Sequence, residues 1–305
     1  MSDEGFKSGF VNIVGNPNVG KSTLMNLLVG EKLSIVTPKS QTTRHRIIGI
    51  VNTDDMQIVY CDTPGVVKPG YLLQERMRAF SESALSDADI ILYVTDVVEK
   101  PEKNLDFIQH VAKAKVPVIV LVNKIDLSDN QRLGELVEQW HALLPEAEIL
   151  PISATNRFNI EPLQKRICEL LPVAPRYFEA DQLTDRPVRF FVSEVIRGKA
   201  LRYYAEEIPY AVEVEVTAFK EAADRIDIEA VIIVERESQK GIIIGHGGKA
   251  IKKLGTASRK TLEQLFDKHI RLDLFAQAHI PAHGPKRGGQ TVDFGGQLRP
   301  VHTIG

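Results

Sequence analysis

Apolar positions form continuous runs in the first half of the chain. FVNIVG, ADIILYVTD, VPVIVLVNK and AEILPISA alternate with helical patterns near 101–115, 130–144 and 160–171. Runs without polar alternation indicate strands buried on both faces, as in a parallel sheet covered by helices. IIGIVN and QIVYCD predict an antiparallel pair of strands. We therefore expect an α/β fold with a mixed, mostly parallel, doubly wound sheet.

The pattern changes after residues 171–187, LPVAPRYFEADQLTDRP, whose prolines and acids indicate a linker. A helix is expected near 188–203, followed by the period-two strands AVEVEVTAF and DIEAVIIVE. A glycine-rich stretch, a helix near 248–266 and the strand IRLDLFAQAHI complete an α-β-β-α-α-β order. The predicted domains are 5–172 and 188–282, joined by a linker over 173–187. The tail over 283–305, rich in Gly, Pro, His and Gln, is expected to be irregular.

Composition narrows the class of protein. A length of 305 residues suits two domains, and a net charge of −2 means that any nucleic-acid contact must come from a local basic patch. Cys61 and Cys168 stand alone, which indicates a reducing compartment and two inert core thiols. The chain begins without a signal-peptide pattern, and its apolar runs are far shorter than the ~20 residues of a membrane span. We expect a cytoplasmic protein, with peripheral contact to the inner membrane face left open.

Residues 15–22 read GNPNVGKS, a full match to the P-loop pattern G-x-x-x-x-G-K-[ST]. The preceding strand and the following helix are the setting that this motif requires. Its glycines let backbone N–H groups turn toward phosphate oxygens. Lys21 can reach the β- and γ-phosphates, and the Ser22 hydroxyl can ligate Mg²⁺.

The choice of base comes from NKID, Asn123 to Asp126, at the end of a buried strand. A carboxylate there can accept hydrogen bonds from the N1–H and N2–H₂ groups of guanine, whereas adenine would leave Asp126 unpaired. Lys124 can pack its stem along the base. Ser153 and Ala154, in ISA after the next strand, suit a backbone donor to guanine O6.

Two further segments are typical of a γ-phosphate sensor. In DTPG, Asp62 can hold the Mg²⁺ shell and the Gly65 N–H can contact the γ-phosphate. In QTTRH, residues 41–45, either Thr42 or Thr43 can ligate Mg²⁺, and we favour Thr43. Loss of the γ-phosphate would release both loops.

These motifs resemble those of translation-factor-class small GTPases over about 170 residues. The resemblance implies Lys21, Thr43 and Gly65 as the catalytic set, Ser22, Thr43 and Asp62 as Mg²⁺ ligands, and water attack on GTP. Val66 stands where Ras-type enzymes place a water-orienting Gln, so slow intrinsic hydrolysis is expected. Some relatives with Asn at the position of Asn18 bind K⁺ beside the phosphates, which makes K⁺ a hypothesis here. The residues expected to contact GTP or GDP are Asn16, Asn18, Val19, Gly20, Lys21, Ser22, Thr23, Asp62, Gly65, Asn123, Lys124, Asp126, Ser153 and Ala154.

A second glycine stretch, GIIIGHGGKAIKKLG over 241–255, lacks the P-loop spacing. Its G-x-x-G core inside an α-β-β-α-α-β module resembles a type II KH domain, whose loop clamps about four single-stranded nucleotides. The segment from Lys240 to Asp273 contains eight Lys or Arg residues and only three Asp or Glu residues. This local positive charge suits a phosphate partner. The expected RNA-binding residues are Gly245, His246, Gly247, Gly248, Lys249, Lys252 and Lys253.

A GTPase followed by such a domain resembles the bacterial KH-domain GTPases of ribosome assembly, in the TrmE-Era-EngA-like family. The resemblance runs from about residue 5 to 276 and implies a monomeric GTP switch that binds small-subunit ribosomal RNA near its 3′ end. In that group GTP favours the RNA-binding arrangement. The segment after the last strand departs from the group, which usually ends in a charged, Trp-containing segment. Two other functions stay open: an RNA-docking module that hardly turns GTP over, and a GTPase of tRNA modification or membrane transport.

Overall fold

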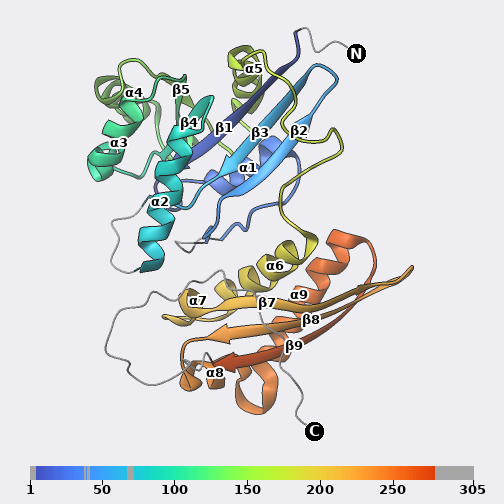
Figure 1. The fold of residues 1–305 in the computed structure, drawn as a ribbon. Coiled ribbons are helices and arrows are strands. Elements are labelled where there is room, and N and C mark those ends of the chain that lie inside the picture. Colours follow the sequence, from blue (N-terminus) through green and yellow to red (C-terminus); the bar gives the residue numbers. More distant parts are fainter. Residues whose placement is uncertain (1–4, 38, 40–41, 67–71, 279–305) are drawn as a thin grey trace, which may run out of the picture.

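The protein has two domains, each with its own sheet and core (Figure 1). A computed structural model describes residues 5–37, 39, 42–66 and 72–278. The predicted tail over 283–305, the end of the second predicted domain over 279–282 and Gln41 of the QTTRH motif lie outside these residues. Helix α6 (Val188–Tyr203) begins the second domain and lies between the two sheets.

The first domain is built on a six-stranded sheet of order β2-β3-β1-β4-β5-β6. Only β2 runs antiparallel, against β3, and the other neighbours are parallel, which confirms the mixed sheet and the predicted strand pair. The strands are β1 (Lys7–Gly15), β2 (Ile47–Asn52), β3 (Met56–Asp62), β4 (Ile90–Asp96), β5 (Val118–Asn123) and β6 (Glu148–Pro151). The carboxyl ends of β1, β3, β5 and β6 carry GNPNVGKS, DTPG, NKID and ISA, whereas QTTRH precedes β2.

Helices cover both faces of this sheet, as the continuous apolar strands predict. One core joins the sheet to α1 (Lys21–Val29) and α5 (Ile160–Leu170). The opposite core joins it to α3 (Leu105–Ala112), α4 (Asn130–Leu143) and the end of α2 (Leu72–Ser86). Short 3-10 turns over Pro101–Asn104 and Ile125–Leu127 precede α3 and α4. Trp140 of α4 is 1% exposed and packs 5.3 Å from the Tyr93 ring, which fixes α4 to β4.

Helix α2 was not predicted. Its buried positions include Met77, Ser81 and Ala84, which are spaced as one helical face. Ser81 and Ala84 are small, and the Ser81 hydroxyl donates to the Pro64 carbonyl at 2.8 Å. A stripe of this kind carries little hydrophobic periodicity, so the pattern of large apolar residues does not reveal it.

The second domain has a three-stranded sheet of order β7-β8-β9, antiparallel between β7 and β8 and parallel between β8 and β9. The strands are β7 (Glu213–Glu221), β8 (Arg225–Val234) and β9 (His269–Ala278). Alternate residues of β8, from Ile226 to Val234, are buried against α6 and α9 (Lys249–Phe266). This one-sided core confirms the period-two interpretation of both strands.

Two short helices of this domain were not placed from the sequence. α7 (Ile208–Ala211) connects α6 to the sheet, and α8 (Glu237–Ile244) includes the first four residues of the glycine-rich stretch, Gly241–Ile244. Ile243 of α8 is fully buried, so it belongs to the core. Only Gly245–Gly248 interrupt the helical path before α9 begins.

The segment predicted as a linker, 173–187, runs along the first domain. The Gln57 side chain joins it through hydrogen bonds to the backbone of Tyr177 and Phe178. Farther on, the Ile50 N–H donates to the Leu183 carbonyl at 2.8 Å. The two domains therefore meet through a segment that is itself fixed to β2 and β3.

Candidate nucleotide and RNA sites

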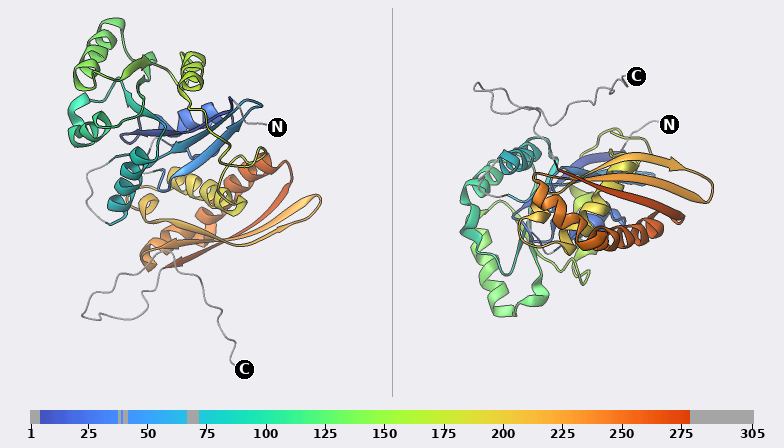
Figure 2. Two further views of the ribbon diagram at one scale, coloured as in Figure 1. Left: turned by 45° about the horizontal axis from the view of Figure 1, so that its top comes forward. Right: turned by 90° about the horizontal axis from the view of Figure 1, so that it is seen from below.

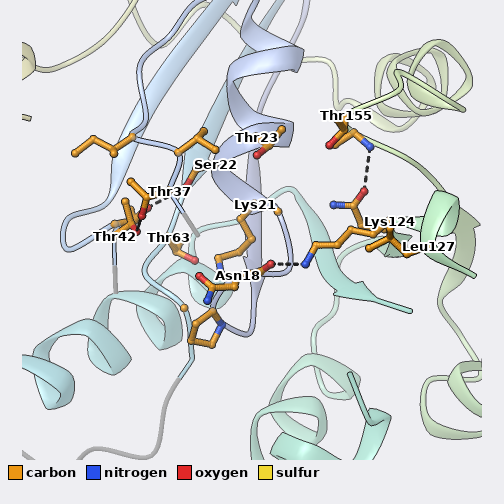
Figure 3. A pocket seen from close by; sticks show the side chains of 18 of the residues that line it. Asn18, Lys21, Ser22, Thr23, Thr37, Thr42, Thr63, Lys124, Leu127 and Thr155 are labelled. Carbon is orange, nitrogen blue, oxygen red and sulfur yellow. Dashed lines mark hydrogen bonds between the residues drawn. The ribbon is translucent and has the colours of Figure 1, made fainter. Parts of the chain in front are cut away.

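A cavity of about 550 Å³ opens at the carboxyl ends of the first domain's strands (Figure 3). Open α/β sheets place ligands at this edge. The predicted nucleotide residues that line the cavity are Asn18, Gly20, Lys21, Ser22, Thr23, Thr43, Gly65, Asn123, Lys124, Asp126 and Ala154. Its size and its mixture of cation, amide and hydroxyl groups suit a nucleotide.

The P-loop wraps around the Lys21 side chain. Lys21 is 6% exposed, and its Nζ donates to the carbonyls of Gly15 at 3.0 Å and Asn16 at 2.7 Å. Burial lowers the pKa of Lys21 from 10.5 to about 8, while Asp62 and Glu99 oppose that shift. A buried ammonium under a glycine loop is poised to bind an anion, because phosphate charge would replace the water that the amine has lost.

Ser22, Thr43 and Asp62 form a cluster of oxygen atoms beside Lys21. The Ser22 and Thr43 hydroxyls lie 3.0 Å apart, and Ser22 donates to the Asp62 carboxylate at 2.7 Å. The other Asp62 oxygen is buried with no hydrogen-bond partner among the described residues. Desolvation by burial raises the pKa of Asp62. Hard oxygen donors with an unsatisfied carboxylate fit Mg²⁺, which takes few protein ligands beside phosphates.

Thr42 and Thr43 point to different partners. The Thr43 hydroxyl lies 3.4 Å from Asp62, whereas the Thr42 hydroxyl donates to the Lys39 carbonyl at 2.7 Å. Only Thr43 is therefore placed with the Mg²⁺ candidates. The nearby Gly65 lies against Pro17, where an added Cβ would stand 2.7 Å from backbone atoms.

Asn123 ties together three loops at the other end of the cavity. Its amide donates to the Val19 carbonyl at 2.8 Å and its oxygen accepts from the Ala154 N–H at 3.0 Å. Gly20 has a φ of 102° and no room for a side chain, because a Cβ would stand 2.3 Å from the Asn123 amide nitrogen. The P-loop, the NKID segment and the ISA segment thus share one hydrogen-bonded junction.

Lys124 and Asp126 extend this junction into the cavity. Lys124 adopts a left-handed backbone, with φ 61°, and its Nζ donates to the Asn18 carbonyl at 2.7 Å (Figure 3). The same Nζ donates to Asp96 at 2.5 Å. The Asp126 carboxylate accepts from the Ser153 hydroxyl at 2.6 Å. Ser153 thus orients the predicted base reader and does not itself line the cavity.

Asn16 and Val19 were predicted to contact nucleotide, but their side chains turn away from the cavity. Val19 is buried in the core shared with α1, and the Asn16 amide donates to Glu99 at 2.5 Å. Asp62 does not line the cavity either, but its carboxylate accepts a hydrogen bond from Ser22, which does. The backbone groups of Asn16 and Val19 are the only parts of these residues left to contact a phosphate.

Other lining residues were not predicted. Thr63 lies inside DTPG and Thr155 directly follows ISA, so the motifs themselves were a usable signal. Asp96, which holds Lys124, ends strand β4 at the same sheet edge. Arg202 comes from α6 of the second domain, and no sequence pattern could place it beside a P-loop.

The loop that carries Thr43 is bonded to the second domain. Arg197 of α6 forms a buried ion pair with Glu194 at 2.6 Å and donates to the Thr42 carbonyl at 2.5 Å. Arg44 donates to the carbonyls of Val212 at 2.9 Å and Tyr210 at 2.7 Å. Bonds from both sides of Thr43 thus connect the oxygen cluster to the second domain.

The G-x-x-G loop is an open turn at the start of α9. Gly245, Gly247 and Gly248 all have positive φ, and Gly247 and Gly248 have no atom within 4 Å of an added Cβ. His246 and Lys249 are exposed. An open glycine turn that delivers the N–H groups of an 18-residue helix suits close approach of a phosphate backbone.

Family models match both domains. A model of the 50S ribosome-binding GTPases matches residues 10–124, and a KH-domain model matches residues 207–280. No helix of the described part of the chain has the length and apolar character to cross a membrane. The protein is a P-loop GTPase that carries a KH domain.

Comparison with individual proteins narrows the family further. GTPase Era of Lactobacillus helveticus is 45% identical over 279 residues, 91% of this chain and 92% of that relative, and GTPase Era of Geobacter metallireducens is 43% identical over 280 residues, 91% and 94%. Two Era structures match with a TM-score of 0.85 at 36% identity, covering 90% of this chain and 95% of theirs. One is an Aquifex aeolicus Era variant bound to GDP·AlF₄⁻, and the other is Era with MgGDPNP and nucleotides 1506–1542 of 16S ribosomal RNA. The chain belongs to the Era family of GTPases.

Proposed function

We propose that this protein is a GTP-controlled switch that binds small-subunit ribosomal RNA near its 3′ end and assists assembly of the small subunit. One observation carries the proposal: the loop with Thr43 joins the nucleotide cavity to the KH domain through Arg44 and Arg197. A γ-phosphate that orders Thr43 would therefore act on both domains at once. A relative bound to 16S nucleotides 1506–1542 supports the choice of RNA.

Within this function, Ser22, Thr43 and Asp62 would hold Mg²⁺, which neutralises charge on the phosphates when bound. Lys21 and the P-loop N–H groups stabilise the charge that grows as water attacks the γ-phosphate. Gly65 lines the same cavity, where its N–H could contact the γ-phosphate. Val66 is 5% exposed and packed in the core, and its apolar side chain cannot orient water, so we expect slow intrinsic turnover.

The binding experiment uses an RNA strand that copies the 3′ end of the small-subunit RNA. Affinity is measured with GDP and with a non-hydrolysable GTP analogue, for the wild type and for Gly247→Asp. Gly134→Asp, an exposed glycine of α4 with no atom near its Cβ position, is the matched control. Tighter binding with the analogue, lost only in Gly247→Asp, is expected. Binding that ignores nucleotide and both substitutions would contradict the proposal.

We also propose Asn18 as a K⁺ ligand beside the phosphates. Asn18 has a left-handed backbone, with φ 66°, and lines the cavity next to Lys21. Equal hydrolysis rates in K⁺ and Na⁺ would remove this role. A monomeric state and peripheral contact with the inner membrane face stay predictions, for which light scattering and flotation with anionic vesicles are the measurements.

A further inference from the structure

The basic residues of the KH domain fall into two groups. Four of the eight between residues 240 and 273 make ion pairs within the domain: Lys240, Arg259, Lys268 and Arg271. The other four make none with any described carboxylate: Lys249, Lys252, Lys253 and Lys260. The local excess of positive charge therefore belongs almost entirely to the second group.

These four lysines share one face of α9, because their spacing repeats every three, four and seven residues. They line a hollow of about 480 Å³ together with Thr256 and Ala257. No carboxylate lines it, and the next one along α9, Glu263, lies 3.9 Å from Arg259. The face begins at the residue after the G-x-x-G loop and extends about 16 Å along the helix.

An aromatic ring from another helix completes the hollow. Tyr203, the last residue of α6, is 44% exposed, and the Lys253 ammonium lies 5.0 Å from its ring centroid. Surfaces that follow a nucleic-acid backbone combine cations with exposed rings on which bases stack. Like charges on one helix face repel each other. Packing between α6 and α9 therefore does not explain why four lysines lie together without a described carboxylate partner.

We infer that Tyr203, Lys252, Lys253 and Lys260, with Lys249 at the loop end, form a second RNA contact that binds the sugar–phosphate backbone beyond the nucleotides held by Gly245–Gly248. The inference rests on the proposed RNA-binding function. A G-x-x-G loop holds about four nucleotides, so a longer partner must leave the loop along some surface. The lysine face is continuous with the loop and has the required charge.

Two RNAs test the contact: a short single strand that copies the 3′ end, and the same strand extended by the upstream sequence. Lys252→Ala with Lys260→Ala removes two charges from the hollow. Lys165→Ala with Lys220→Ala removes two exposed lysines that also lack described ion pairs and lie on α5 and β7. Tyr203→Ala removes the ring and Tyr203→Phe keeps it.

For the longer RNA, the Lys252/Lys260 variant should lower the slope of log Kd against log salt by about 1.5, since each lost phosphate contact lowers it by about 0.7–0.9. Tyr203→Ala should weaken that RNA about tenfold, as expected for a lost stacking partner, and Tyr203→Phe should not. The short strand should bind all of these variants like the wild type. Far-ultraviolet circular dichroism checks that each variant is folded.

Three outcomes overturn the inference: no change with the longer RNA, an equal loss in the Lys165/Lys220 control, or an equal loss for both RNAs. The last would make the lysine face part of the loop's own clamp. If only the longer RNA binds and Gly247→Asp has no effect, the lysine face stands and the proposed G-x-x-G clamp fails. If neither RNA binds the wild type, both fail; capture of an acidic protein by the same lysines would then assign the face to another partner.

Discussion

Asn123 holds three loops in place through two hydrogen bonds, and Gly20 leaves the space in which it does so. A buried amide that loses its partners costs about 1–3 kcal/mol. The end of the cavity formed by the NKID and ISA segments, where guanine is expected, therefore depends on the Asn123 side chain, which need not touch the base.

Gly20→Ala should lower the free energy of unfolding by about 2–4 kcal/mol, from left-handed strain together with the lost Asn123 bond. Urea denaturation gives this value, and GTP affinity should fall with it. Gly30→Ala is the control, because Gly30 has φ 84° but open space around its Cβ position. It should cost only about 1–2 kcal/mol. Equal losses in the two variants would show that the Gly20–Asn123 approach is unimportant.

Lys21 makes nucleotide binding depend on pH. Its pKa is about 8 in the folded protein and 10.5 when unfolded, so between these values the unfolded chain binds more protons and stability rises with pH. Bound phosphates favour the charged amine, so above pH 8 the protein should take up a proton as it binds GTP. Calorimetry at pH 9 in buffers of different ionisation enthalpy measures that uptake. At pH 7 the contribution of Lys21 should be small, and uptake no larger at pH 9 would contradict the assignment.

Single residues were the easier part of the site to predict. GNPNVGKS, DTPG and NKID have fixed spacings on strand ends, and most of their side chains line the cavity. The sequence could not decide firmly whether Thr42 or Thr43 ligates Mg²⁺. Two neighbouring residues of the same type differ only in the direction in which the loop turns their side chains. Asn16 and Val19 were predicted from their motif positions, but the Asn16 amide donates to Glu99 and the Val19 side chain is buried in the core.

Elements were predicted where large apolar residues repeat and missed where small ones do. The strands and helices α3, α5 and α9 carry clear periods of large apolar residues. Helices α2 and α8 do not: α2 buries Ser81 and Ala84, and α8 contains Gly241 before the run of three isoleucines. The loop with Thr43 has no pattern of its own and is held by bonds to α6 and to the backbone near α7.

Replacing both members of the buried pair, as Arg197→Met with Glu194→Gln, should free this loop without leaving a buried charge unpaired. The Thr42 carbonyl loses a charged donor, so hydrogen exchange at the amides of residues 42–44 should rise about tenfold in the GTP-analogue state. Mass spectrometry of the exchanged peptide measures it. Arg166→Ala, which removes only exposed pairs with Glu148 and Glu169, is the control. Unchanged exchange would mean that Arg44 holds the loop by itself.

At the scale of the whole molecule, α6 lies between the sheets of the two domains (Figure 2), and its Arg197 donates to the Thr42 carbonyl. Gly198 permits the approach, because an added Cβ would stand 3.0 Å from the Ile35 side chain. Arg202, one turn later, reaches the Val36 carbonyl at 2.7 Å and lines the nucleotide cavity. Sequence motifs predict each domain by itself. The residues that pack together here, such as Gly198 and Ile35, are about 160 positions apart in the chain, so no local pattern predicts their contact.

Gly198→Val should push α6 away from the nucleotide domain and weaken the effect of GTP on RNA affinity, while each domain stays folded. Small-angle scattering should report a larger radius of gyration. Gly134→Val in α4 is the control: it makes the same change in helix propensity, but Gly134 has no atom within 4 Å of its Cβ position, so neither quantity should change. A normal radius together with normal GTP control would contradict the importance of this contact.

The segment 173–187 has a consequence for how the protein can be divided. It lies along β2, the edge strand of the large sheet, where Leu183 accepts from Ile50 and Thr184 donates to the Ile48 carbonyl at 2.6 Å. A chain shortened to residue 172 would lose this cover and present an unsatisfied strand to solvent. Such edges recruit strands from other molecules. The isolated nucleotide domain should therefore stay soluble when it ends after Arg186 and self-associate when it ends at the apparent boundary fourteen residues earlier.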